Sequence, residues 1–310
     1  MISSASAMPS NRPGSLVEME EQLWIIYALG SALGLASADA LTKRYFVGLP
    51  PYGMILVRLL FAVPFLGIGW LCISIPPLGR TFFYAVAAAL PLEIVAQLLY
   101  MRALQVSPIS LCTPMLAFTP VLLILTGQVL LGESLNIWGI GGIGLVAAGS
   151  YILNLDRRRY GWLAPLTALW QASGPRLMLL VAAIFACTSA LGKLAVLNSA
   201  PTFFGLFYPC VFTGVMLSGY PWSRSRPGKL LWARPGWGLL LGFCAAASIL
   251  CHMHGIQLAP AAYLIALKRT SLVISVLYGG LWLKESHLAA RLPGSLLMAA
   301  GVILIAWKGS

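Results

Sequence analysis

Two adjacent cations, Lys268 and Arg269, lie in the middle of the otherwise apolar run from Ala261 to Glu285. A helix that begins after Pro260 places them roughly 12 to 14 Å deep, near the centre of a ~30 Å hydrocarbon layer. Each cation at that depth costs ~2.5 to 3.5 kcal/mol. We therefore expect the pair to face a polar cavity, a partner or an anionic ligand. Neutralisation by buried acids, for packing alone, is the alternative.

A single acid, Glu93, lies near the middle of the apolar segment 81–103. Gln97 follows one helical turn later and shares its face. When the second half of the chain is aligned on the first, the counterpart of Glu93 is Ala245, so this acid does not belong to a symmetric scaffold. We interpret Glu93 as a substrate-binding or proton-coupling group, with a structural counter-ion as the alternative.

Three further side chains are candidates for the same site. Arg58 falls six residues into the segment 52–74 and can either snorkel to the interface or reach the site. Tyr263 is a candidate wall residue, although packing is the usual role of an aromatic ring. His252 and His254 are turned about 200° apart around a helix, so they cannot share one metal ion. We keep His252 as a candidate coupling group, and we expect neither a metal nor a cofactor.

Other patterns favour structural roles. Asp39 and Lys43 are spaced i, i+4 with the acid first, which favours an ion pair on the surface of one helix. The run Gly139 to Gly144 matches GxGxxG, but it follows no strand, so the pattern does not indicate a dinucleotide site. Small residues four apart, such as Gly144 and Ala148, are instead expected to let helices approach closely.

The composition indicates an all-α integral membrane protein. Of the 310 residues, 59% are hydrophobic and only 9% are charged, whereas soluble domains carry about 25% charged residues. The net charge of +12 is scattered over short loops and single helix positions, so it forms no nucleic-acid surface. The six cysteines lie in apolar segments without CxxC spacing, so neither a disulfide framework nor a zinc site is expected.

Hydropathy and proline punctuation predict ten transmembrane helices. Residues 1–21 form a polar tail that we expect to be disordered, and residues 156–175 form a basic linker with Arg157, Arg158 and Arg159. These segments delimit two five-helix units, 22–155 and 176–308. The expected spans are 23–38, 52–74, 81–103, 108–131, 136–154, 176–197, 202–221, 235–257, 261–283 and 288–307.

The two units are copies of one another. An offset of 152 aligns Met101 with Met253, Gln105 with Gln257, Pro108 with Pro260, Glu133-Ser134 with Glu285-Ser286, and Ala148-Gly149 with Ala300-Gly301. An offset of 150 aligns Ala40-Leu41 with Ala190-Leu191, Lys43 with Lys193, and Pro51 with Pro201. Because each unit holds five helices, the second copy must be inverted in the membrane. Inverted repeats are typical of secondary transporters, whose site lies near the midplane at the repeat interface.

The chain resembles the EamA family of the drug/metabolite transporter superfamily. The resemblance rests on the five-helix unit, on Lys43 and Lys193 near the ends of the first helix of each half, on Arg58 in the second helix, and on the Leu-Gly-Glu and Leu-Lys-Glu turns that end at Glu133 and Glu285. It covers roughly residues 22–308. It implies a transporter fold, while the family's substrates range from amino acids and nucleotides to sugars, drugs and lipid-linked groups.

The cation pair also resembles the tandem Lys-Arg that binds substrate phosphate in the triose-phosphate translocator branch. Lys268 and Arg269 outweigh Glu93 by one charge, so we expect a small organic anion, either a carboxylate or a phosphate ester. Arg269 can fork onto two oxygens while Lys268 acts as a point charge. A flippase for an anionic lipid-linked group is the main alternative. An intramembrane enzyme is a remote one, since no nucleophile–base pair is evident.

We expect a multi-pass protein of the cell's inner (plasma) membrane, with membrane lipids and a small-molecule substrate as partners, no nucleic acid, and a homodimer left open. Arg12, Arg80 and Lys308 lie on the side of the termini. The loops of the other side hold Arg157, Arg158, Arg159, Arg176, Arg224, Arg226, Lys229, Arg234, Lys284 and Arg291. The positive-inside rule therefore predicts that both termini face away from the cytoplasm.

Overall fold

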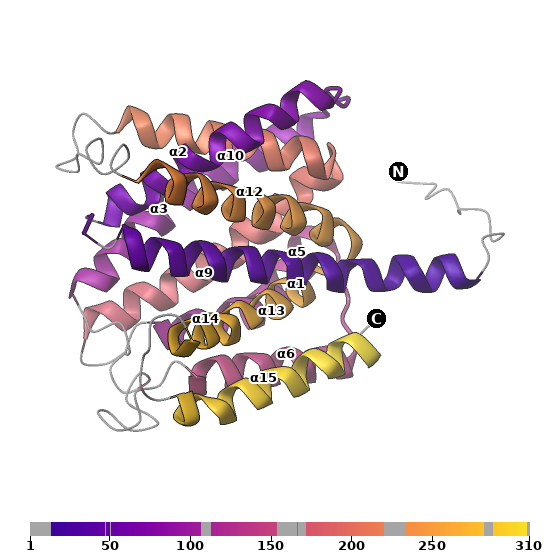
Figure 1. Ribbon diagram of the computed structural model, residues 1–310. Coiled ribbons are helices and arrows are strands. Elements are labelled where there is room, and N and C mark those ends of the chain that lie inside the picture. The colour runs from indigo at the N-terminus through magenta and orange to yellow at the C-terminus, as the bar shows by residue number, and fades with distance from the viewer. Residues whose placement is uncertain are drawn as a thin grey trace.

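The computed structural model describes residues 14–46, 48–49, 51–106, 113–153, 166, 172–219, 234–281 and 288–308, and all regular structure within them is helical (Figure 1). The first half contains α1 (Gly14–Tyr45), α2 (Pro51–Gly69), the 3₁₀ turn η1 (Trp70–Cys72), α3 (Arg80–Val106), the 3₁₀ segment η2 (Thr113–Phe118), α5 (Thr119–Leu131) and α6 (Ile137–Leu153). The second half contains α9 (Ser173–Leu197), α10 (Pro201–Ser218), α12 (Pro235–Leu258), α13 (Ala261–Lys268), α14 (Thr270–Leu281) and α15 (Leu288–Lys308).

Six of these helices, α1, α2, α3, α9, α10 and α12, are long and apolar enough to cross a bilayer. Shorter apolar helices cover Met115–Leu131, Ile137–Leu153 and Pro293–Lys308. Large apolar side chains point outward, with Leu71 at 86% and Val129 at 82% exposure. Such a surface is unfavourable in water but matches lipid tails, and the helices satisfy their own backbone hydrogen bonds. The chain is a multi-pass membrane protein.

Prolines set several helix ends. The corresponding helices α2 and α10 begin at Pro51 and Pro201. Proline is favourable at the first helical position because the N–H it lacks would have no intrahelical acceptor there. α2 ends at Gly69, earlier than the expected span 52–74, and η1 carries the helical stretch only to Cys72. The Pro76-Pro77 pair then keeps the chain out of a helix until α3.

α1 starts earlier than the sequence predicts. It begins at Gly14, inside the segment 1–21 that we expected to be a disordered tail, and it extends beyond the other helices on the right of Figure 1. Glu18, Glu20 and Glu21 lie in this extension. Glutamate is a good helix former, and adding residues to an existing helix needs no new nucleus. The polar segment from Gly14 onward therefore continues α1 as a helix, where we had expected a disordered tail.

The expected single span 261–283 is broken at the cation pair. α13 ends at Lys268, Arg269 forms a turn, and α14 begins at Thr270. The Arg269 N–H donates to the Ala266 carbonyl at 3.1 Å, and the Leu272 N–H donates to the Arg269 carbonyl at 2.9 Å, both in tight three-residue steps. No Pro or Gly occurs in the α13 sequence or at the break, so local sequence offers no signal for it.

Helices of the two halves are interleaved in the bundle. α1 packs along α12, and its repeat counterpart α9 packs along α3, the counterpart of α12. In the same way, α14 packs against α1 and α5 packs against α9. α1 begins and α15 ends at the same end of the bundle (Figure 1). This exchange of equivalent contacts is what two inverted repeats produce, and it places their interface along these helix pairs.

The last helices of the two halves, α6 and α15, meet through glycines. A Cβ on Gly142 would lie 2.9 Å from the Gly301 carbonyl oxygen, and a Cβ on Gly149 would lie 2.6 Å from that of Gly294. Small residues do bring these helices together, as expected. The residues differ from those we named, however, because nothing lies within 4 Å of a Cβ built on Gly144.

Candidate functional site

The cation pair lies at the break between α13 and α14, and both side chains are partly buried. Lys268 is close enough to interact electrostatically with Arg58, Asp39 and Glu93 as well as with its neighbour Arg269. These groups come from α1, α2 and α3 of the first half, whereas the pair belongs to the second half. The structure therefore brings three of the predicted site residues, Lys268, Glu93 and Arg58, together at the repeat interface.

Arg269 has a buried donor that is not used within the described part of the chain. Its Nε atom is buried and has no hydrogen-bond partner among the described residues. Neither Arg269 nor Lys268 forms an ion pair with a described carboxylate. A buried donor without a partner costs about 1 to 3 kcal/mol, and more for a charged group. The packing-only alternative, in which buried acids pair with both cations, has no support among these contacts.

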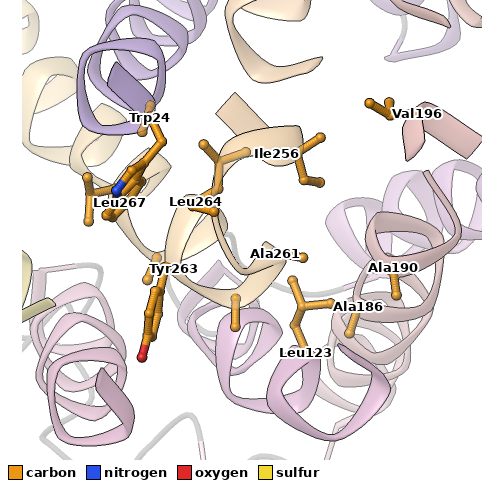
Figure 2. Packing of buried hydrophobic residues seen from close by; sticks show 14 of the residues in the cluster. Trp24, Leu123, Ala186, Ala190, Val196, Ile256, Ala261, Tyr263, Leu264 and Leu267 are labelled. Atoms are coloured by element: carbon orange, nitrogen blue, oxygen red, sulfur yellow. The ribbon is translucent and has the colours of Figure 1, made fainter. Parts of the chain in front are cut away.

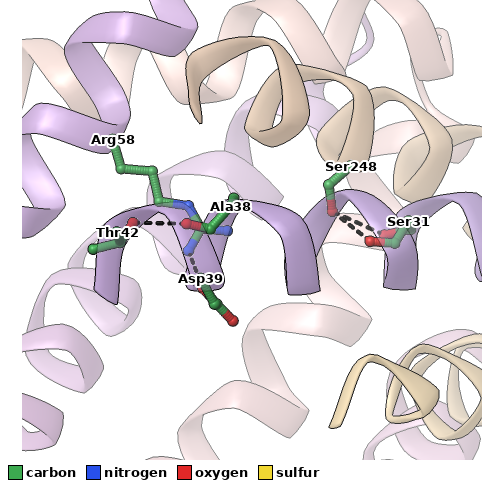
Figure 3. A network of polar contacts seen from close by, with 6 residues as sticks. All are labelled: Ser31, Ala38, Asp39, Thr42, Arg58 and Ser248. Atoms are coloured by element: carbon green, nitrogen blue, oxygen red, sulfur yellow. Dashed lines mark hydrogen bonds and ion pairs between the residues drawn. The ribbon is translucent and has the colours of Figure 1, made fainter. Parts of the chain in front are cut away.

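Asp39 and Arg58 form an ion pair between α1 and α2, with Arg58 Nη1 2.7 Å from Asp39 Oδ1 (Figure 3). We had expected Asp39 to pair with Lys43, whose side chain lies outside the described residues. Arg58 had two expected roles, and the structure gives it a contact that orients its guanidinium within the bundle near Lys268. The pair is partly open, since its side chains are 30% and 52% exposed.

Glu93 lies in α3 with hydrogen-bond donors around it. Gln97 Nε2 donates to Glu93 Oε1 at 3.2 Å, so the two residues share a face as their spacing predicts. The Thr188 hydroxyl of α9 lies near the carboxylate and donates to the Phe185 carbonyl at 3.3 Å, and the Tyr208 ring of α10 lies within electrostatic reach of Glu93. Sequence reasoning missed Thr188 and Tyr208, because nothing in the chain pairs residues so far apart.

The two histidines of α12 have different surroundings. His254 is satisfied, because its ring nitrogens lie 3.2 Å from the Thr202 hydroxyl and 2.9 Å from the Leu250 carbonyl, and its ring stacks on Tyr27. His252 lies within electrostatic reach of Lys268, and its buried Nδ1 has no partner among the described residues. Of the two, His252 is the one that faces the charged cluster.

Tyr263 is not part of this cluster. It is 2% exposed, its ring stacks on Trp24 at 6.4 Å, and its hydroxyl lies so close to Gly139 that a Cβ there would overlap it (Figure 2). A residue five positions before Lys268 is turned by about 140° around the helix, which explains why the two side chains point to different neighbours.

Lys193 also lies away from the cation pair. Its Nζ contacts the Glu133 carboxylate and the Ala259 carbonyl. The cluster therefore consists of Lys268, Arg269, Arg58, Asp39 and Glu93. Among the described residues, three cations of this cluster face two carboxylates, so one positive formal charge remains.

Comparisons with known proteins agree with this architecture. A model of the EamA-like transporter family matches residues 22–155 and 172–307. No curated protein matches the chain. A solved structure described as "Crystal structure of protein" has a TM-score of 0.69 and 15% sequence identity, and the match covers 93% of this chain and 98% of that one. At this identity the likeness shows the fold alone.

Proposed function

Because the chain belongs to the EamA-like transporter family, a family of small-molecule transporters, we propose that it is a secondary active transporter that moves a small organic anion. In this proposal ten helical segments cross the plasma membrane, with the broken span α13–α14 counted once. The substrate binds between the two halves beside Lys268 and Arg269. The halves then rock about this site, so that it is open to one side of the membrane at a time.

The observation that carries the proposal is the buried Nε donor of Arg269, which has no partner among the described residues. A buried guanidinium keeps its charge, so it needs acceptors, and its fork fits two oxygens of a carboxylate or a phosphate ester. Lys268 lies next to it and adds a second charge. Because Asp39 already accepts from Arg58 and Glu93 accepts from Gln97, the described acids have other partners. An anionic substrate would balance the remaining positive charge.

Glu93 and His252 are the groups that we propose for proton coupling. Each is a titratable side chain within electrostatic reach of Lys268. Protonation of either one changes the charge that surrounds the substrate, so substrate affinity and proton binding are linked. Glu93 lies on α3 of the first half and His252 on α12 of the second. Movement of one half against the other therefore changes the distance between the two groups, and with it their electrostatic interaction.

The test is ligand binding to the purified chain with panels of phosphate esters, carboxylates, amines and neutral sugars, followed as thermal stabilisation. We expect an anion to stabilise the native chain. Lys268→Ala and Arg269→Ala should each weaken its binding about ten- to a hundredfold and abolish uptake, because a charge-assisted hydrogen bond contributes about 1.5 to 3 kcal/mol. Arg269→Lys should recover only part of the affinity, since it lacks the fork.

Arg80→Ala is the matched control, since Arg80 is an exposed cation at the start of α3, outside the cluster. It should bind the anion as the native chain does. Unchanged transport in either cation variant, or stabilisation of the native chain by amines or neutral sugars only, would remove the anionic substrate from the proposal. Binding that requires a lipid-linked anion, with no binding of its water-soluble headgroup, would instead indicate a flippase.

A further inference from the structure

Glu133 and Lys193 form a buried ion pair between the two halves of the chain. Their side chains are 13% and 8% exposed. Glu133 follows α5, where Gly132 adopts φ 68°, a left-handed conformation that glycine adopts without strain. This turn lets the Gly132 N–H donate to the Gln128 carbonyl at 3.0 Å and directs the chain back toward the bundle.

Each charge of the pair also holds the backbone at the start of α13. Lys193 Nζ donates to the Ala259 carbonyl, and the Ala261 N–H donates to the two Glu133 carboxylate oxygens at 3.2 and 3.0 Å. Ala261 is the first residue of α13. The carboxylate therefore caps the N-terminus of α13, where the helix dipole favours a negative charge. Lys268 is the last residue of the same helix.

This cluster lies at the end of the bundle that holds the start of α1 and the end of α15. Asn136, three residues after Glu133, donates to the carbonyl of Lys308 at 2.7 Å. Glu133 belongs to the first family match, and the residues that it contacts belong to the second. Movement of one half away from the other at this end must therefore separate Glu133 from Lys193 and Ala261.

We propose that Glu133 and Lys193 are positioning residues of the transport site: a latch across the two repeats that seats α13 and keeps this end closed. The inference rests on the proposed function. A buried ion pair is costly to break while its members stay buried, but both charges are hydrated once the end opens. The latch thus has two acceptable arrangements, closed and paired or open and hydrated, and it opposes those in between.

The test separates the latch from a merely structural pair. Glu133→Gln or Lys193→Met alone leaves one buried charge without its partner, and such a chain can fail to fold. The double variant Glu133→Gln/Lys193→Met removes both charges at nearly constant volume, so it should fold. Without the latch, the open state should gain population, and the Michaelis constant for the substrate should change because α13 is no longer held.

The readout is the labelling of Ala190→Cys by a bulky water-soluble maleimide in proteoliposomes, with the six native cysteines replaced by alanine. Ala190 is fully buried on α9, one turn before Lys193, in the same buried cluster as Leu123 and Ala261 (Figure 2). We expect labelling in the double variant to be at least about tenfold faster than in the parent chain, which corresponds to about 1.4 kcal/mol. The matched control Ser134→Ala, an exposed residue next to Glu133 in the same loop, should label at the parent rate.

Equal labelling of the double variant and the parent, in folded protein, would overturn the latch. This result is independent of the substrate, because labelling needs no transport. If the double variant opens while no anion binds the native chain, the latch stands and the anionic substrate is wrong. If anions bind through Lys268 and Arg269 while labelling is unchanged, the proposed function stands and the latch is wrong.

Discussion

At the scale of single residues, the site depends on how each charge is paired. Asp39 accepts a hydrogen bond from Arg58, and Glu93 accepts one from Gln97, so these groups are held in position before a ligand arrives. Arg269 differs, because its buried Nε has no partner within the described chain. A ligand acceptor that meets this donor gains a charge-assisted hydrogen bond without displacing a protein group.

Glu93→Gln provides the residue-scale prediction. Glutamine keeps the size of the side chain and an oxygen that can accept from Gln97, but it cannot take up a proton. We expect this variant to lose gradient-driven accumulation and to keep substrate exchange, measured in proteoliposomes with and without a pH gradient and by counterflow. Thr188→Val is the control: it removes a hydrogen bond, leaves the carboxylate, and should remain coupled. Equal loss of accumulation and exchange in Glu93→Gln would favour a structural counter-ion.

At the scale of elements, two devices position the site: the break between α13 and α14, and close helix contacts. The break places Lys268 and Arg269 at helix ends inside the bundle, at the end of α13 and before α14. The α6–α15 contact joins the last helices of the two halves. Gly142 faces Gly301, and Gly149 faces Gly294. At the repeat offset of 152, Gly294 corresponds to Gly142 and Gly301 corresponds to Gly149, so the two contacts are equivalent in the two repeats.

Gly149→Ala should destabilise the protein by about 1 to 3 kcal/mol, because the added methyl group meets the backbone of α15 and one of the helices must move. A Cβ there lies 2.6 Å from the Gly294 oxygen and 2.7 Å from the Met298 nitrogen. Gly144→Ala is the control on the same helix, since its Cβ would meet open space. Thermal unfolding in detergent measures both. Equal stability of the two variants would contradict the close contact.

At the scale of the whole molecule, the inverted repeats explain why the chain needs both halves for one site. The cations come from the second half, while Glu93 and Arg58 come from the first. In the transport cycle that we propose, rocking of one half against the other changes access to this cluster from either side. The end that carries the start of α1 and the end of α15 also carries the proposed latch, so the orientation of the termini decides which membrane face the latch closes.

Charge counts predict that this end faces away from the cytoplasm. Arg80 and Lys308 lie on it, while the sequence assigns Arg157 to Arg159 and several further cations to loops of the other side. The positive-inside rule then predicts phosphatase activity for a periplasmic reporter fused after Ser310. A fluorescent protein that matures only in the cytoplasm should stay dark there. Fluorescence of that fusion, with an inactive phosphatase, would place the termini inside.

The sequence by itself determined the class, the family and the repeat. These features depend on composition, on the length of apolar runs and on internal similarity, all of which are local or periodic properties of the chain. The face shared by Glu93 and Gln97 is of the same kind, because it follows from the turn of one helix. The extension of α1 to Gly14 shows where composition misleads, since polar residues can continue a helix.

Only the tertiary structure decided which partners meet. Asp39 reaches Arg58 on another helix, Lys193 reaches Glu133 in the other half, and Tyr263 turns into the core against Trp24. The break at Arg269 contains neither Pro nor Gly, so the local sequence does not predict it. Each of these contacts depends on which helix faces lie opposite one another in the bundle. The spacing of residues along one helix does not predict contacts between distant segments.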